Sequence, residues 1–354
     1  MKMEELLGVV VKASASDLHI SPGQPPLMRV NGELLPIGAH EVLKPEDTKQ
    51  LIESILSPDQ IKQLATFLEI DLALEIPNVA RFRINAFHQS RGLAAAIRVI
   101  PEKVPTLDGL EMPVIFKELL DLPNGLILVT GPTGSGKSTT LAAMVDYLNT
   151  NSAYHIITIE DPIEFTHKSK KCLVNQRQVV RDTADFATAL RSALREDPDV
   201  ILVGEMRDLE TIRLALTAAE TGHLVMATLH TSSAPRAISR IVDVFESGEK
   251  NIIRNMLSES LQAVICQTLV KRISGGRVPA FEIMLGTSAI RNLIREDKIA
   301  QMYSTIQTGS ATGMCTLDQY LERLVSKEII TAVSARDSTS NKGMFQTEVV
   351  SSGM

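Results

Sequence analysis

The residues best suited to chemistry stand between positions 125 and 139, where a short apolar run leads into glycines and then into Lys137 and Ser138. Their spacing fits G-x-x-x-x-G-K-[ST], the pattern of a phosphate-binding P-loop. Glycines let backbone N–H groups approach phosphate oxygens, and the start of the following helix adds partial positive charge. We expect ATP here, with Lys137 offsetting the β- and γ-phosphate charge and Ser138 coordinating Mg²⁺. The predicted nucleotide-binding residues of this loop are Gly131, Pro132, Thr133, Gly134, Ser135, Gly136, Lys137, Ser138 and Thr139.

Three carboxylates follow a second apolar segment, in the stretch Glu160-Asp-Pro-Ile-Glu-Phe165. Open α/β sheets bind ligands beyond the carboxyl ends of their strands. Carboxylates in that position can hold or polarise Mg²⁺ and orient an attacking water molecule. Glu160, Asp161 and Glu164 are therefore candidates for such roles. The alternative is a solvated acidic turn closed by Pro162, since acidic turns are common.

A third apolar segment, Val200–Val203, is followed by Gly204 and Glu205, which is typical of a Walker B strand. Glu205 is therefore a candidate for the metal site, directly or through water. Asp199 precedes the strand and lies at the wrong end for the metal. Asp208 is expected to cap the following helix.

Two histidines frame a fourth apolar segment, with His223 at its start and His230 at its end. A histidine can donate to a phosphate or relay the state of the γ-phosphate. The alternative is a structural histidine at a strand end. For His230 the functional and structural interpretations have equal weight. For His223 the residues alone favour the structural interpretation.

Arginines gather near the end of the first third of the chain, at Arg81, Arg83, Arg91 and Arg98. Arginines on apolar-flanked strands are costly to bury unless they meet anions. Their guanidinium groups match phosphate oxygens, on the P-loop of the same chain or of a neighbouring one. A solvated face with salt bridges is the alternative.

Composition limits the class of protein. The 354 residues favour two domains, and 44% hydrophobic with 22% charged residues is typical of a globular protein. The net charge of −6 and the 4% aromatic content disfavour a nucleic-acid partner. The three cysteines form no C-x-x-C pair, so neither zinc nor a disulfide framework is expected. No apolar run reaches the roughly 18 residues of a membrane span.

The pattern of apolar residues predicts how these groups are positioned. Residues 1–100 indicate an α+β domain, and the prolines and glycine of 101–113 indicate a linker. From 114 to 354 strands and helices alternate, which predicts an α/β domain with a parallel sheet, extended by a helical region from about 287. The predicted strands are 17–20, 26–30, 70–74, 81–89, 93–100, 126–130, 155–159, 200–203, 223–229 and 278–284, with an Asn31-Gly32 turn after the second. The predicted helices are 6–12, 45–68, 137–148, 186–195, 210–220, 234–244 and 252–261.

Four blocks stand in one order along the chain: GPTGSGKST, IEDPIEF, RSALREDPDVILVGEMRD and TGHLVMATLHTSSA. Together they resemble the secretion-superfamily (GspE-like) ATPases, and specifically their type IV pilus retraction branch. Ala15–Ile20, Arg81–Asn85 and Ala289–Glu296 extend the resemblance to nearly the whole chain. Assembly and secretion relatives usually carry a further N-terminal domain and a zinc-binding tetracysteine insert, and neither is expected here.

The resemblance implies a PAS-like N-terminal domain and a RecA-like ATPase domain, with ATP between them. It implies a homohexamer in the cytoplasm, at the inner face of the inner membrane, that drives pilin back into that membrane. The implied partners are an inner-membrane platform protein of the pilus and, indirectly, pilin.

The resemblance also implies roles for single residues. Glu164 matches the catalytic glutamate of the acidic box, and Glu205 the Walker B glutamate. Arg83 and Arg98 match arginines that reach the nucleotide from the N-terminal domain, with Arg81 a third candidate. The remaining matches are Glu160 and Asp161 in the acidic box, His223 and His230 in a histidine box, and Ala289–Glu296 in a motif of the retraction branch.

The sequence thus predicts a hexameric ATPase motor for pilus retraction and twitching motility. A pilus assembly or type II secretion ATPase, or an accessory retraction ATPase, is the alternative within the family. A RecA-like DNA-dependent ATPase is the alternative from another class.

Overall fold

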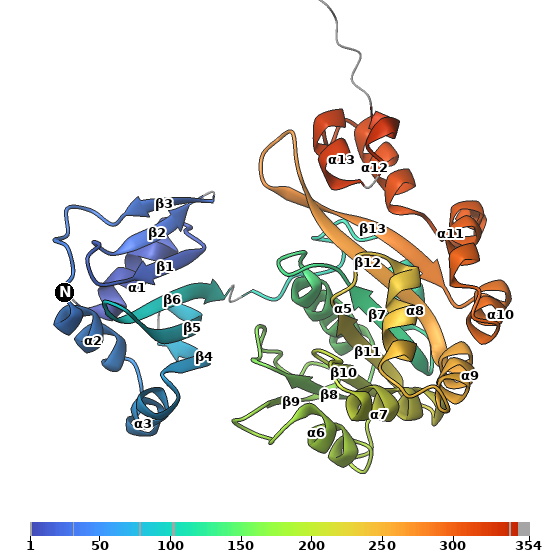
Figure 1. Ribbon diagram of the computed structural model, residues 1–354, viewed down its shortest axis with the longest axis horizontal. Helices are drawn as coiled ribbons and strands as arrows, with labels where there is room; N and C mark the ends of the chain where they lie inside the picture. The colour runs from blue at the N-terminus through green and yellow to red at the C-terminus, as the bar shows by residue number, and fades with distance from the viewer. Residues whose placement is uncertain (1, 31, 78, 101–102, 340, 346–354) are drawn as a thin grey trace, which may run out of the picture. The chain divides into compact units, whose positions relative to one another are not determined.

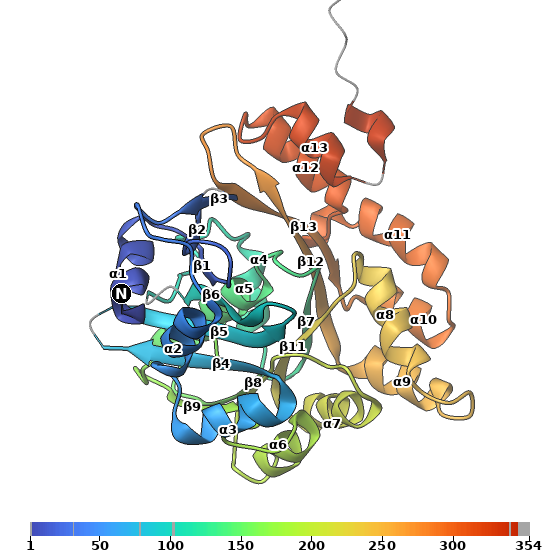
Figure 2. The same ribbon diagram turned by 60° about the vertical axis from the view of Figure 1, so that its left-hand side comes forward.

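The computed structural model describes residues 2–30, 32–77, 79–100, 103–339 and 341–345. It divides into two compact units, drawn in Figures 1 and 2. The first comprises Met1–Val104 with Pro162–Thr166, and the second Pro105–Asp161 with His167–Met354. Residue 31 of the predicted Asn31-Gly32 turn lies outside the described residues. So do residues 101 and 102 of the predicted 101–113 linker.

The first unit is built on a six-stranded antiparallel sheet in the order β3-β2-β1-β6-β5-β4. The strands are β1 (Asp17–Ile20), β2 (Leu27–Val30), β3 (Glu33–Pro36), β4 (Glu69–Ile76), β5 (Ala80–Gln89) and β6 (Gly92–Ile100). The helices are α1 (Met3–Lys12), α2 (Pro45–Glu53) and α3 (Pro58–Phe67). The predicted strands of this region are confirmed, whereas β3 was not predicted.

Strict alternation along the strands gives this sheet two different faces. On β5, Phe82 and Ile84 are fully buried and join a core with Leu7 of α1 and Ile52 of α2. The intervening residues, Arg83 among them, point to the opposite face. The helices therefore cover one face, and the arginines occupy the other.

The second unit is built on a seven-stranded sheet in the order β13-β12-β7-β11-β10-β8-β9. The strands are β7 (Gly125–Thr130), β8 (His155–Glu160), β9 (Leu173–Gln178), β10 (Val200–Val203), β11 (Leu224–Leu229), β12 (Leu261–Lys271) and β13 (Arg277–Leu285). All neighbours are parallel except β12 and β13, so the parallel sheet predicted from the sequence is in fact mixed. β9 and β12 were not predicted.

Helices pack on both faces of this sheet, which confirms the predicted α/β class (Figure 1). On one face α4 (Ile115–Leu120) and α5 (Lys137–Asn151) bury Ile127 and Val129 of β7. On the other face the helices contact Leu126 and Leu128. These helices are α6 (Phe186–Ala193), α7 (Leu209–Glu220), α8 (Ala234–Asp243), α9 (Lys250–Ser260), α10 (Ser288–Arg295) and α11 (Ile299–Thr308).

The predicted helical region after residue 287 is confirmed as far as Ser338, with α10 and α11 followed by α12 (Leu317–Ser326) and α13 (Ala332–Ser338). The helices α12 and α13 pack against Val270 of β12 and Val278 of β13. Within the described residues, no helix is both long enough and apolar enough to cross a membrane.

Candidate functional site

The P-loop lies between the end of β7 at Thr130 and the start of α5 at Lys137. Gly131 and Gly136 have positive φ angles of 143° and 91°, which residues with a side chain rarely adopt. A Cβ at Gly131 would stand 2.3 Å from the backbone oxygen of Gln267. The loop can therefore pass this close to β12 only because residue 131 is a glycine.

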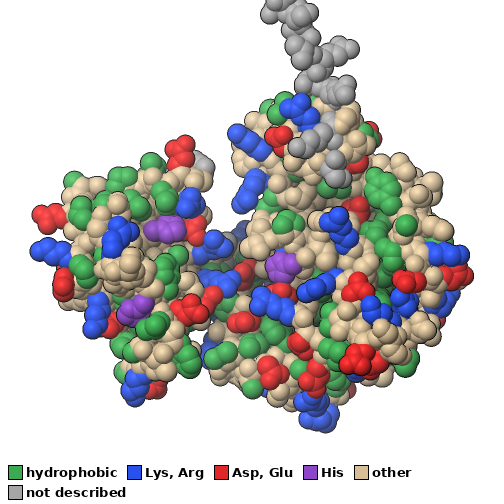
Figure 3. Space-filling model, viewed as in Figure 1, with side chains coloured by type: hydrophobic (Ala, Val, Ile, Leu, Met, Phe, Trp, Pro, Cys, Tyr) green, Lys and Arg blue, Asp and Glu red, His purple; other side chains and the backbone are tan. Residues whose placement is uncertain are grey.

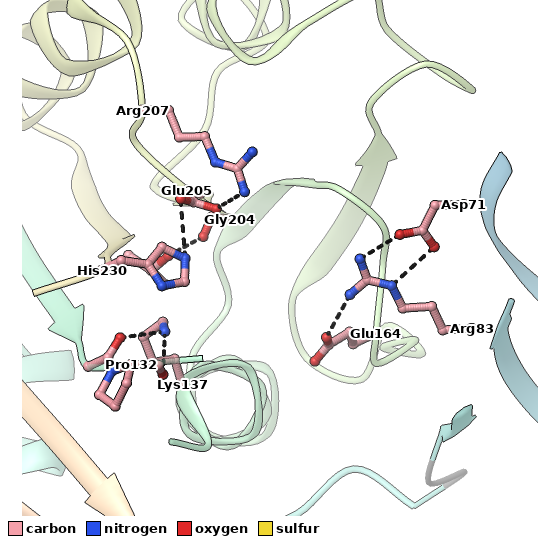
Figure 4. Close-up of polar contacts among 11 residues, drawn as sticks. Asp71, Arg83, Pro132, Lys137, Glu164, Gly204, Glu205, Arg207 and His230 are labelled. Carbon is pink, nitrogen blue, oxygen red and sulfur yellow. Dashed lines mark hydrogen bonds and ion pairs between the residues drawn. The ribbon is translucent and has the colours of Figure 1, made fainter. Parts of the chain in front are cut away.

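The loop holds its lysine in a defined position. The Lys137 ammonium donates to the backbone oxygens of Gly131 at 2.8 Å and Pro132 at 3.1 Å (Figure 4). The Ser135 hydroxyl oxygen is buried and has no hydrogen-bond partner among the described residues. An orphaned hydroxyl, a buried ammonium and the N–H groups at the start of a helix are suited to the oxygens of a triphosphate. The loop therefore fits the predicted nucleotide.

Gln267 of β12 supports the P-loop, a role that no motif in the sequence indicates. Its amide donates to the backbone oxygen of Ser135 at 2.7 Å, and its carbonyl accepts from the Thr140 hydroxyl at 2.7 Å. The side chain is 2% exposed. One buried amide thus joins the loop and helix α5 to the neighbouring strand.

Glu205 lies just beyond the carboxyl end of β10, as predicted for a Walker B acid. Its carboxylate accepts from Arg207 at 2.7 Å and stands 3.2 Å from Nε2 of His230 (Figure 4). Burial favours its neutral form, but the hydrogen bond from Arg207 and the charge of His230 together hold the pKa of Glu205 below its usual value. The group is therefore an anion at neutral pH, as a metal site requires.

Parallel pairing brings the other predicted groups of the second unit to the same edge of the sheet. Glu160 ends β8 and accepts from Thr158 and from Gln176, while Asp161 follows it directly. His230 follows β11, which pairs with both β7 and β10. The residues at or just beyond the carboxyl ends of neighbouring parallel strands are thus the P-loop, Glu160, Asp161, Glu205 and His230.

His223 is not brought to this edge. It precedes β11, and its backbone oxygen accepts from the N–H of Gly125 at the start of β7. Its Nδ1 contacts the backbone oxygen of Ala218 at 3.0 Å. Within this chain His223 lies at the amino end of the strand, away from the P-loop, so its predicted role at the nucleotide stays a prediction.

Asp208, by contrast, caps α7 as expected. It accepts hydrogen bonds from the backbone N–H and the hydroxyl of Thr211 at 2.8 Å and 2.6 Å.

In the first unit, two of the four predicted arginines, Arg83 and Arg98, have acidic partners. Arg83 pairs with Asp71 at 2.8 Å and lies 3.6 Å from Glu164, which belongs to the Pro162–Thr166 segment grouped with this unit (Figure 4). Arg98 pairs with Asp17 at 2.9 Å. Arg81 donates to the hydroxyl of Thr166 in the same segment. The fourth arginine, Arg91, lies exposed beyond the end of β5.

Each unit carries groups that suit an anionic ligand. In the second unit the P-loop amides and Lys137 offer donors to phosphates, and Ser138 with Glu205 offers oxygens to Mg²⁺. In the first unit, guanidinium groups and the carboxylate of Glu164 stand within one cluster. Phosphoryl transfer to water uses residues of these types, namely phosphate donors, metal-binding oxygens, a carboxylate and guanidinium groups.

Known proteins resemble the chain over most of its length. The model of a family described as type II/IV secretion system protein matches residues 3–343. A Pseudomonas aeruginosa protein named "Type IV pilus retractation ATPase PilT" is 62% identical, over 95% of this chain and 98% of its own length. A Neisseria gonorrhoeae "Twitching motility protein" is 55% identical, over 89% of this chain and 84% of its own length.

A solved structure of the pilus retraction motor PilT with bound ADP superposes with a TM-score of 0.89 at 46% identity, covering 97% of this chain and 98% of that one. Sequence and fold therefore agree over both units. The chain belongs to the type II/IV secretion system protein family and, within it, to the PilT-like members.

Proposed function

We propose that this protein is an ATP hydrolase that powers the retraction of type IV pili. The observation that carries the proposal is the combination of a complete P-loop and Walker B site with 62% identity to a pilus retraction ATPase along nearly all of that protein. The substrate is ATP, and the products are ADP and phosphate.

The residues of the second unit bind the triphosphate. The backbone amides of the P-loop and the ammonium of Lys137 hold the β- and γ-phosphates. Ser138 and Glu205, the latter directly or through water, would hold Mg²⁺, which would offset phosphate charge when bound. Arg207 and His230 keep the Glu205 carboxylate ionised and oriented.

The acids and arginines supply the chemistry around the γ-phosphate. Glu164 orients the attacking water and accepts its proton, as a carboxylate in the acidic box can do. Arg83 and Arg98, with Arg81 as a third, stabilise the charge that develops during transfer. Since these arginines belong to a separate unit, their engagement and release would convert hydrolysis into movement.

We propose that six copies form the working ring, at the cytoplasmic face of the inner membrane, and pull on pilin through a membrane platform protein. Retraction rather than assembly is supported by the names of the relatives that are 62% and 55% identical. The net charge of −6, and the mixing of basic and acidic side chains on the visible face of the second unit in Figure 3, argue against a DNA-dependent ATPase.

Two assays test this function. Purified protein should release phosphate from ATP with Mg²⁺ and lose the activity with EDTA, and Lys137→Ala should abolish turnover while leaving the protein folded. Expression in a P. aeruginosa strain that lacks its PilT should restore twitching motility, and Lys137→Ala should not. ATP turnover without restored motility would reject the retraction role, and turnover that rises with added DNA would support the other class.

A further inference from the structure

In the first unit, the face of the sheet opposite the helices carries a row of charged side chains. In the register of the strands, Asp17 of β1 stands opposite Arg98 of β6, and Arg98 stands opposite Arg83 of β5. Directly opposite residues share a face, so these side chains lie side by side. Ala73 of β4 is directly opposite Arg83, and Asp71 lies two residues before it on the same face of the strand. Asp71 is therefore the diagonal neighbour of Arg83. The order across the sheet is acid, arginine, arginine, acid.

Two arginines that face each other on neighbouring strands repel. Here each one has a carboxylate on its outer side, which offsets that repulsion. Asp71 holds Arg83 with two bonds, from Nε at 3.2 Å and from Nη2 at 2.8 Å. Asp17 holds Arg98 through Nε at 2.9 Å and is itself held by the Ser16 hydroxyl at 2.7 Å.

Both acids therefore approach the Nε side of their arginine. A guanidinium group has two usable edges, and a bidentate acid on one edge fixes the plane and direction of the other. For Arg83 the other edge carries Nη1, which lies 3.6 Å from the Glu164 carboxylate. An anionic oxygen thus stands near the edge that points away from Asp71.

We propose that Asp71 is a positioning residue that aims Arg83 at the γ-phosphate, with Asp17 in the same role for Arg98. This inference rests on the proposed function, in which these arginines stabilise the transition state. Without Asp71 the side chain of Arg83, which is 33% exposed, samples several rotamers. The entropy lost when it is ordered then adds to the activation free energy. Since the benefit is realised as charge develops, kcat should fall while KM changes little.

The test is a double-mutant cycle on the full-length ATPase with Asp71→Asn and Arg83→Gln. Asp71→Asn should lower kcat about tenfold and change KM less than twofold. In the Arg83→Gln background the same change should have no further effect, because there is no guanidinium left to aim. Asp71→Glu, which keeps a carboxylate on the same strand, should recover part of the lost rate.

Glu69→Gln is the matched control, since it removes one charge from the same face of β4 at a position opposite Phe87. It should leave kcat unchanged. A wild-type kcat in Asp71→Asn would overturn the inference alone, provided that Arg83→Gln is impaired. An equal loss from Asp71→Asn in both backgrounds would also overturn it, because the acid would then act independently of Arg83. Wild-type turnover in Arg83→Gln would instead reject the arginine role in the proposed function, and this inference with it.

Discussion

Replacing Gln267 by methionine tests whether the strand β12 sets the shape of the P-loop. Methionine has a similar length and no hydrogen-bonding amide. The change therefore removes the hydrogen bonds to Ser135 and Thr140 with little change in volume. The groups left behind are buried, since Thr140 is fully buried and Ser135 is 3% exposed. The Thr140 hydroxyl can turn to a backbone oxygen of its own helix, but the backbone oxygen of Ser135 loses its partner in Gln267.

An unsatisfied buried acceptor costs about 1–3 kcal/mol. The free loop can escape this cost by relaxing until the Ser135 oxygen meets water, and nucleotide binding must then reverse the relaxation. Because each 1.4 kcal/mol is a factor of ten, the Kd for ADP should rise about tenfold. Calorimetric titration of the purified protein with ADP and Mg²⁺ measures this directly.

Thr140→Val is the control for the loss of the hydrogen bond from Gln267 to Ser135. It removes the hydroxyl that contacts the far side of the same amide but leaves the bond to Ser135 in place. Its Kd should change less than threefold. A Kd for Gln267→Met within twofold of wild type would refute the claim that this amide shapes the loop.

Three further changes give distinct expectations. Glu164→Gln should keep nucleotide binding and lose hydrolysis, and if Glu205→Gln alone shows that pattern in a phosphate-release assay, the two roles are exchanged. Burial lowers the pKa of His167 to about 4, from about 6.5 in an unfolded chain, so its contribution to stability is complete above pH 6.5 and is lost as the pH falls towards 4. His167→Gln should flatten the decline of Tm over that range, and an unchanged slope would contradict the assignment. Arg291 donates to backbone oxygens at the end of α9 and at Gly286, so Arg291→Ala should lower Tm, and a wild-type Tm would show that these bonds add nothing.

Much of the fold could be predicted because local patterns were strong. The alternation on Ala80–Gln89 and the apolar run of Val200–Val203 gave strands at nearly the observed bounds. Leu261–Lys271 was missed because it continues directly from α9 and lacks turn residues between them, so its start carries no local signal. The antiparallel edge strand β13 could not be separated from a parallel one, since direction is set by tertiary pairing.

The positions of the candidate residues could be predicted where a motif has a fixed spacing, as for the P-loop after β7 and Glu205 after β10. The site was not predictable where a common residue gains its role from distant neighbours. Gln267 lies more than a hundred residues from Ser135, and Asp71 has no motif around it. Only the fold brings such partners together.

The central claim is that one nucleotide is held by the P-loop of one unit and by arginines of the other. A structure of the assembled protein with Mg²⁺ and a non-hydrolysable ATP analogue tests it most directly. The account predicts a guanidinium group of Arg83 or Arg98 within hydrogen-bond distance of the γ-phosphate in at least one subunit. Phosphates bound by the P-loop with neither guanidinium group within hydrogen-bond distance of the γ-phosphate in any subunit would contradict it.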